Sequence, residues 1–381
     1  MTIFLARPEA PREGVPLAVK DLFDTVGLET TYGSAVFAGN VPERTAEAVA
    51  RLEAAGYANV GKANLHEFAY GITSQNPHFG TVPNPAAPGR LAGGSSGGSA
   101  AALAAGLADA ALGTDSGGSI RIPASWCGIV GLKPSFGLVP LDGCFPLAPT
   151  FDHAGPMART VDGCSAMLEA LAPGFQPARL DSLEEIALGV AWTELGEPLV
   201  QARVEAAAAL FPRSRPVDFR LPDWRDRLFM HEVAGVHREL FREHAALYGE
   251  NVRAKVERCL AITDAEAEES GRARERYRER CLEALSGLDL LLTPTTAFVA
   301  PPDDADDLDI REATIRLTIP FNLLGWPALA LPCGPAEGGL PASTQLVGRP
   351  GDDALVLAAG ALLEASLDRG TARPSRLPTN P

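Results

Sequence analysis

Residues 93–121 read GGSSGGSAAALAAGLADAALGTDSGGSIR, so two glycine–serine loops flank a short run of small residues. The spacing of apolar residues between the loops predicts a helix over 99–108 and a strand over 110–114. Consecutive glycines let backbone N–H groups turn toward one point, an arrangement that holds an anion or a developing oxyanion. One such loop alone is usually a turn, but two loops joined by a small-residue helix indicate a functional site.

Strands alternate with helices outward from this stretch. Short apolar runs predict strands over 15–19, 58–61, 186–192, 288–292, 328–331 and 344–347. Helical spacing predicts helices over 45–55, 200–210 and 354–363, and residues 223–286 are dominated by charged helical sequence. This alternation predicts a single α/β domain over residues 1–381, with a helical layer at about 200–286.

The composition favours a folded, acidic protein. Of 381 residues, 46% are hydrophobic and 21% are charged, so the chain can bury a large core. The formal charge of −15 argues against nucleic acid and anionic membrane surfaces as partners. No uncharged apolar run approaches the roughly 18 residues of a membrane helix, and the N-terminus lacks the layout of a signal peptide. We therefore expect a soluble, cytoplasmic protein.

Cysteine and lysine carry further information. The six cysteines form no CxxC pair, a pattern that favours buried thiols over disulfides or a zinc site. Lysine is rare beside arginine, and Lys20, Lys62 and Lys133 all fall in the first part of the chain. Because lysine can lose its proton near neutral pH and arginine cannot, a lysine in such a chain is a candidate base.

The loops themselves allow other interpretations. A glycine-rich stretch before a helix can bind phosphate, but GGSSGGS lacks the GK[ST] ending and no GxGxxG follows a strand. Residues 93–97 formally satisfy GxSxG, with Ser95 as the nucleophile of an esterase. That elbow requires a buried strand before it, whereas residues 84–90 (NPAAPGR) have the composition of a loop.

Four motifs together decide between these interpretations. The chain contains GVPLAVKD at 14–21, GGSSGGS at 93–99, GTDSGGSIR at 113–121 and GLKPS at 131–135. In this combination it strongly resembles the amidase signature family, and residues 61–71, 151–160, 290–296, 319–334 and 345–350 also look like segments of that family. The resemblance implies a large, mixed, twisted β-sheet covered by helices on both faces.

The resemblance also implies a Ser–cisSer–Lys triad. By their motifs, Lys20 is the base, Ser95 the relay and Ser119 the nucleophile, and the backbone N–H groups of Ser116, Gly117, Gly118 and Ser119 form the oxyanion hole. Such an enzyme hydrolyses the C–N bond of a small or medium amide through an acyl-enzyme, with no metal or cofactor. We expect Asp115 and Arg121 to brace the nucleophile loop. Candidate residues of the substrate pocket are Tyr70, Trp126, Cys144, Phe145 and Phe151.

The same motifs occur in the glutamine-hydrolysing component of tRNA-dependent amidotransferases, so the triad cannot separate the two activities. The short stretch before the first motif, and the absence of a C-terminal extension that would face tRNA, favour a stand-alone amidase acting on a small molecule. A homodimer is a further option. Which amide, ureido or carbamate compound is the substrate stays open at this stage.

Overall fold

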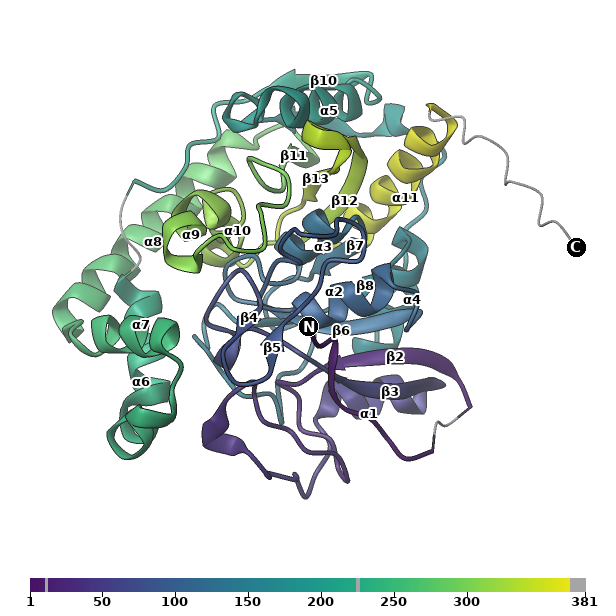
Figure 1. The fold of residues 1–381 in the computed structure, drawn as a ribbon. Coiled ribbons are helices and arrows are strands. Elements are labelled where there is room, and N and C mark those ends of the chain that lie inside the picture. The colour runs from purple at the N-terminus through teal and green to yellow at the C-terminus, as the bar shows by residue number, and fades with distance from the viewer. Residues whose placement is uncertain (11–12, 224–226, 371–381) are drawn as a thin grey trace, which may run out of the picture.

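The computed structural model describes residues 1–10, 13–223 and 227–370. In this part of the chain, eleven strands form one mixed sheet (Figure 1). A separate hairpin of β4 (Gln75–Asn76) and β5 (Gly80–Thr81) lies outside it. The spatial order of the large sheet is β1 (Phe4–Ala6), β3 (Tyr57–Ala63), β2 (Val15–Lys20), β6 (Ala110–Asp115), β8 (His153–Ala158), β7 (Val130–Lys133), β12 (Ala328–Pro335), β13 (Pro341–Val347), β11 (Leu290–Pro294), β9 (Ala187–Val190) and β10 (Arg213–Pro216).

The two halves of this sheet come from the two halves of the chain. The six strands from β1 to β7 in the spatial order come from residues 4–158, and the other five from residues 187–347. Antiparallel pairing of β7 with β12 joins the halves. Within the first half, β2 runs parallel to both of its neighbours, β3 and β6. The carboxyl ends of these three strands therefore meet at one edge of the sheet.

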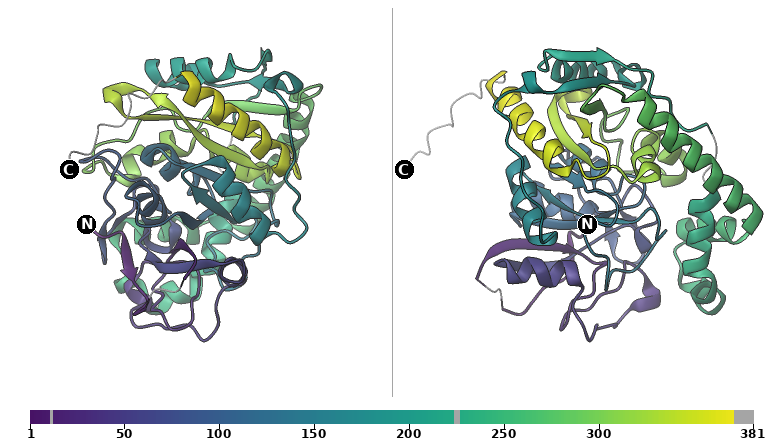
Figure 2. Two further views of the ribbon diagram at one scale, coloured as in Figure 1. Left: turned by 90° about the vertical axis from the view of Figure 1, so that its right-hand side faces the viewer. Right: turned by 180° about the vertical axis from the view of Figure 1, so that it is seen from behind.

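Helices cover both faces because side chains alternate along each strand. On β2, Leu17 and Val19 enter one core cluster while Ala18 enters another. Helices of the first face are α1 (Glu47–Ala54), α4 (Val161–Leu171), α5 (Pro198–Ala208) and α11 (Asp353–Gly370). The second face carries α2 (Gly97–Ala104), α3 (Arg121–Cys127), α8 (Asp264–Ala284) and α10 (Ile319–Leu324). The expected mixed sheet with helices on both faces is confirmed, and Figure 2 shows α11 lying along it.

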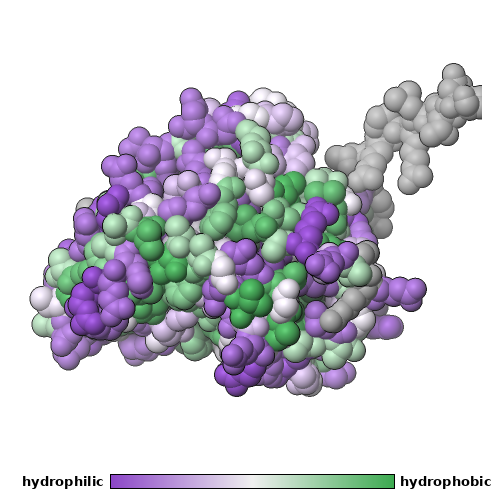
Figure 3. Space-filling model, turned by 60° about the horizontal axis from the view of Figure 1, so that its bottom comes forward, coloured by the Kyte–Doolittle hydropathy of each residue, from purple (hydrophilic) through white to green (hydrophobic). Residues whose placement is uncertain are grey.

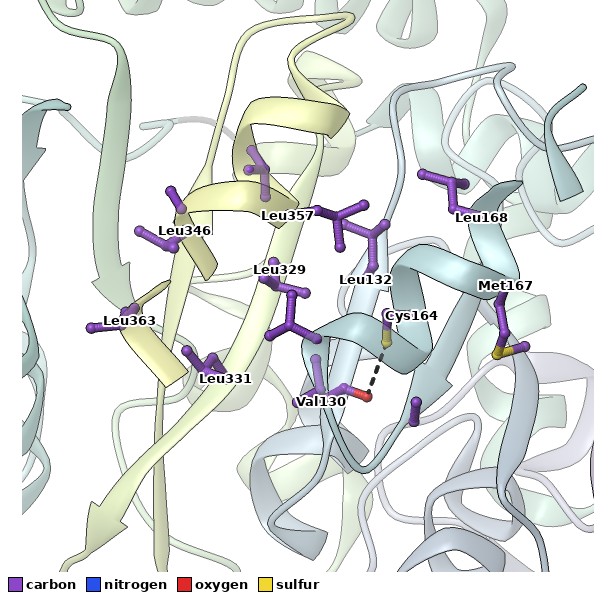
Figure 4. Close-up of a cluster of buried hydrophobic side chains, with 14 of the residues drawn as sticks. Val130, Leu132, Cys164, Met167, Leu168, Leu329, Leu331, Leu346, Leu357 and Leu363 are labelled. Carbon is purple, nitrogen blue, oxygen red and sulfur yellow. Dashed lines mark hydrogen bonds between the residues drawn. The ribbon is translucent and has the colours of Figure 1, made fainter. Parts of the chain in front are cut away.

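The first face holds the larger core, shown where the two halves of the sheet meet in Figure 4. Helices α4 and α11 pack against each other over this junction. Large aliphatic side chains from both halves interlock there, which is why the junction is buried on that face. The labelled residues are Val130, Leu132, Cys164, Met167, Leu168, Leu329, Leu331, Leu346, Leu357 and Leu363.

The remaining helices extend from one side of the sheet. There α6 (Arg227–His244) packs against α7 (Glu250–Leu260) and α8, and α9 (Asp307–Ile315) follows β11 in the chain (Figure 1). The block at about 200–286, expected as a helical layer, contains α5 to α8 and also the edge strand β10, which pairs with β9. The sequence of that strand, RSRP, has no apolar alternation that could have predicted it.

The predicted helix over 99–108 begins at Gly97 and ends at Ala104, because Gly106 takes a left-handed φ of +70°. Strands β7 and β8 and helices α3 and α4 are additions that the sequence analysis did not predict.

No helix within the described residues is long and apolar enough to cross a membrane. On the face that Figure 3 turns forward, hydrophobic residues form patches interrupted by hydrophilic ones.

Candidate active site

The candidate site lies where the carboxyl ends of β2 and β6 meet. Lys20 is the last residue of β2, and Thr114 is the last but one of β6. The Lys20 Nζ atom lies 2.7 Å from Ser95 Oγ, 3.0 Å from Ser96 Oγ and 2.6 Å from Thr114 Oγ1. Among these partners only Ser95 is a sequence prediction. The fold adds Ser96, the next residue of the same loop, and Thr114, which parallel pairing of β2 and β6 brings beside the lysine.

Burial changes the chemistry of Lys20. Its side chain is fully buried, and burial lowers its pKa to about 7. An amine with this pKa is partly neutral at neutral pH, so it can accept a proton from a neighbouring hydroxyl. The site therefore holds a nitrogen base in contact with the first glycine–serine loop.

The other three lysines are buried as well. Lys62 forms an ion pair with Asp21, and Lys255 forms one with Asp307. Lys133 donates to the carbonyl of Pro134, and burial lowers its pKa to about 7 too. A lowered pKa therefore does not single out Lys20; its contact with Ser95 does.

Ser95 is held in a loop immediately before α2. The Gly94–Ser95 peptide bond is cis. The carbonyl of Ser95 accepts hydrogen bonds from the His66 amide at 3.2 Å and from the Ser74 hydroxyl at 3.3 Å. Its side chain is fully buried. The loop is thus fixed from the β3 side while its hydroxyl faces Lys20.

Ser119 belongs to the second loop, between β6 and α3, and is 7% exposed. The Ser96 amide donates to the Ser119 carbonyl at 3.2 Å, which ties the two loops together. Within the described residues no hydrogen bond joins the hydroxyls of Ser95 and Ser119. The structure therefore places Lys20 and Ser95 in direct contact and holds Ser119 beside them through the backbone.

A buried ion pair shapes the second loop. The Asp115 carboxylate accepts two hydrogen bonds from the Arg121 guanidinium, each 2.9 Å long, and others from the amides of Gly118 and Ile120. Although burial alone would raise the pKa of Asp115, the Arg121 charge holds it well below its usual range. Arg121 also donates to Thr318, Asn322 and Gln345 in the second half of the chain. These contacts agree with the expected bracing role of the pair.

The same pair limits the set of amides that could face an oxyanion. The amide of Gly118 is 2.8 Å from Asp115 Oδ1 and donates to it. Gly118 is therefore engaged within the loop in this structure. The other three amides of the expected oxyanion hole are those of Ser116, Gly117 and Ser119.

A cavity of about 140 Å³ adjoins this loop. Its inner wall includes Thr114 and Ser116, and two of the five predicted pocket residues, Cys144 and Phe145, line it. The other lining residues are Leu22, Leu141, Pro146, Leu147, Pro149 and Asp152. Of the remaining predicted pocket residues, Tyr70 and Phe151 lie in the hydrophobic cluster that also contains Leu147, and Trp126 packs in a separate cluster.

Asp152 is a further residue of the site that sequence reasoning missed. Its carboxylate accepts a hydrogen bond from the Ser116 hydroxyl at 2.5 Å and others from the amides of Leu147 and Ala148. Burial raises the pKa of Asp152 to about 6. The residue thereby links the nucleophile loop to the wall of the cavity. Only its position in the FDHAGPMART segment could have drawn attention to it.

Other kinds of site are not formed by the described residues. They contain no group of three His, Cys, Asp or Glu side chains that could hold a metal ion. The six cysteines are free thiols. The segment before Ser95 holds only isolated bridges at Pro83, Arg90 and Leu91, so the strand that a GxSxG elbow needs is missing there. His153 Nδ1 donates to the Phe151 carbonyl at 2.7 Å rather than to a serine.

Comparison with known proteins gives consistent matches along the chain. The sequence model of the family described as Amidase matches residues 4–184 and 174–357. The glutamine-hydrolysing type of relative is represented by a glutamyl-tRNA(Gln) amidotransferase component from Anaeromyxobacter dehalogenans (strain 2CP-C), which is 36% identical to this chain, over 93% of this chain and 83% of that protein. AtzE of Pseudomonas sp. (strain ADP), which is a component of 1-carboxybiuret hydrolase, is 34% identical, over 95% of this chain and 85% of that protein.

A solved structure described as a crystal structure of amidase shares the fold. It superimposes with a TM-score of 0.85 at 40% identity, over 92% of this chain and 84% of that one. The relatives thus include both a component of an amidotransferase and hydrolases of C–N bonds.

Proposed function

The chain belongs to the amidase family, and from that premise we propose that it hydrolyses the C–N bond of a small or medium amide through an acyl-enzyme on Ser119. The observation that carries the proposal is the contact of 2.7 Å between Lys20 Nζ and Ser95 Oγ inside a fully buried pocket. A serine hydroxyl needs a neighbouring base to become a nucleophile, and Lys20 supplies one.

The proton path follows from this contact. Neutral Lys20 accepts the proton of Ser95, and Ser95 accepts the proton of Ser119 as Ser119 attacks the carbonyl carbon. The two serine hydroxyls must come within hydrogen-bonding distance for this step, as catalytic hydrogen bonds commonly do only once substrate is bound. The amides of Ser116, Gly117 and Ser119 stabilise the oxyanion. The proton then passes to the leaving amine, and water hydrolyses the acyl-enzyme.

The test is labelling with a fluorophosphonate, followed by mass mapping of the modified peptide. We expect an adduct on Ser119 that is lost in Ser119→Ala and in Lys20→Met. Ser99→Ala is the matched control, because the Ser99 hydroxyl donates to the Leu112 carbonyl within the α2–β6 packing and has no part in the proton path. An adduct on Ser95 instead would favour the esterase interpretation, and full amidase activity in Ser119→Ala would refute the proposal.

A second candidate is a glutamine-hydrolysing component that acts within a tRNA-dependent amidotransferase. The 36% identity to such a component is the observation that favours it. The two candidates differ in what the isolated chain does. A stand-alone amidase, as a monomer or a homodimer, turns over amides without any other protein. An amidotransferase component is expected to copurify with its partners and to hydrolyse glutamine efficiently only in their presence.

A further inference from the structure

Resting on the proposed function, the geometry of the cavity beside Ser116 points to a substrate class: we propose that the enzyme prefers amides whose acyl group is compact, apolar and uncharged, up to about the size of a phenyl ring. The inference concerns the group on the carbonyl side of the scissile bond. It separates such amides from glutamine and from other amides that carry a carboxylate.

The position of the cavity assigns it to the acyl group. Its inner end is formed by Thr114, Ser116 and Asp152, each at most 6% exposed, and Pro146 and Pro149 at its outer end are exposed. Ser116 belongs to the same loop as Ser119, so a group held in the cavity lies beside the carbonyl carbon under attack. The leaving amine has to escape before water arrives, whereas the acyl group stays attached to Ser119. A buried recess therefore suits the acyl group.

The size of the cavity sets the upper limit of that group. The volume is about 140 Å³. For comparison, an apolar protein cavity of about 150 Å³ lined by aliphatic and aromatic side chains binds benzene. The lining here is of the same kind, with Leu22, Leu141, Phe145 and Leu147 around Cys144. A phenyl or branched aliphatic group fills this space, and a fused bicyclic group exceeds it.

The charges around the cavity set its polarity. None of the described residues that line it is Arg, Lys or His, and its one ionisable carboxyl group belongs to Asp152. The Asp152 oxygens already accept hydrogen bonds from the Ser116 hydroxyl and the amides of Leu147 and Ala148. A substrate carboxylate would thus meet a like charge with no cation to offset it. An uncharged group meets neither cost.

The experiment compares kcat/KM for acetamide, phenylacetamide, 2-naphthylacetamide, succinamate, 4-aminobutyramide and glutamine with the full chain. We expect phenylacetamide to exceed the carboxylate-bearing and ammonium-bearing amides, and also naphthylacetamide, by at least about 10-fold. Preference for succinamate, glutamine or 4-aminobutyramide, or equal rates across the panel, would overturn the inference and leave the proposed function standing. Hydrolysis of no amide, together with no adduct on Ser119, would overturn the proposed function itself.

A matched pair of variants tests whether this cavity is responsible. Leu141 and Leu138 are both partly buried against the same core cluster, but only Leu141 lines the cavity. Leu141→Ala should raise the ratio of naphthylacetamide to phenylacetamide turnover by about 10-fold, while Leu138→Ala leaves that ratio unchanged. An equal response of both variants would overturn the assignment of the acyl group to this cavity. Asp152→Asn keeps the shape of the side chain and removes its charge, so it should narrow the gap between succinamate and phenylacetamide.

Discussion

At the scale of the residue, Lys20 controls how activity depends on pH. Burial lowers its pKa to about 7, and only the neutral amine can accept the proton of Ser95. We therefore expect kcat/KM to be low in acid and to rise with pH through about 7. Lys20→Met should lower kcat/KM by about 10²–10⁴-fold, the usual contribution of a general base. Lys20→Arg should do the same, because a guanidinium stays protonated throughout this range. The measurement is a pH–rate profile for each variant.

Lys133 provides the control for this assignment, since burial lowers its pKa to about 7 as well. Its Nζ atom donates to the Pro134 carbonyl and, among the described residues, hydrogen-bonds to none of the triad. Lys133→Met, which preserves the length of the side chain, should keep the rise in kcat/KM near pH 7. A profile that loses this rise in Lys133→Met and keeps it in Lys20→Met would assign the titration to the wrong lysine.

At the scale of the element, the start of α2 fixes where Ser95 and Ser96 stand. A Cβ atom at Gly98 would lie within 3.0 Å of backbone atoms of Asn64 and Ile3. Gly98→Ala should therefore shift the start of α2, lower stability by about 1–3 kcal/mol and slow labelling of Ser119. Gly235, an exposed helical glycine of α6, has nothing within 4 Å of that position. Gly235→Ala should instead stabilise the protein by about 0.5–1 kcal/mol. Chemical denaturation of both variants checks the contrast, and equal effects would contradict it.

Elements with a local signal are the ones that the sequence predicts well. Strands β2, β3 and β6 and helix α1 match their predicted ranges closely because alternation, helical spacing and a terminal glycine are all contained in a few neighbouring residues. Strand β8 (HAGPMA) contains glycine and proline, and α3 (RIPASWC) has an internal proline, so neither shows the usual pattern. The motifs identify Lys20, Ser95 and Ser119. The contact of Lys20 with Thr114 joins residues 94 positions apart, and only the pairing of β2 with β6 creates it.

At the scale of the whole molecule, the two halves of the sheet share one core. The pairing of β7 with β12 is continuous, α4 and α11 pack over the junction, and Arg121 of the first half bonds to Thr318, Asn322 and Gln345 of the second. A unit joined in this way is expected to unfold cooperatively, in keeping with the single domain that we infer from the sequence. The active-site loop then depends on both halves, because the guanidinium that braces Asp115 is held by the second half.

This coupling leads to a prediction for Arg121. Arg121→Leu leaves the Asp115 carboxylate buried without its charge partner, which should cost about 3–5 kcal/mol. Because the halves unfold together, hydrogen exchange followed by peptide mapping should show the same loss of protection in residues 4–158 and 187–347. Arg242→Leu is the control: Arg242 pairs with Glu239 on the exposed surface of α6, and its loss should cost less than about 1 kcal/mol. Loss of protection confined to one half in Arg121→Leu would show that the sheet consists of two independently unfolding units, and the single-domain inference would then be wrong.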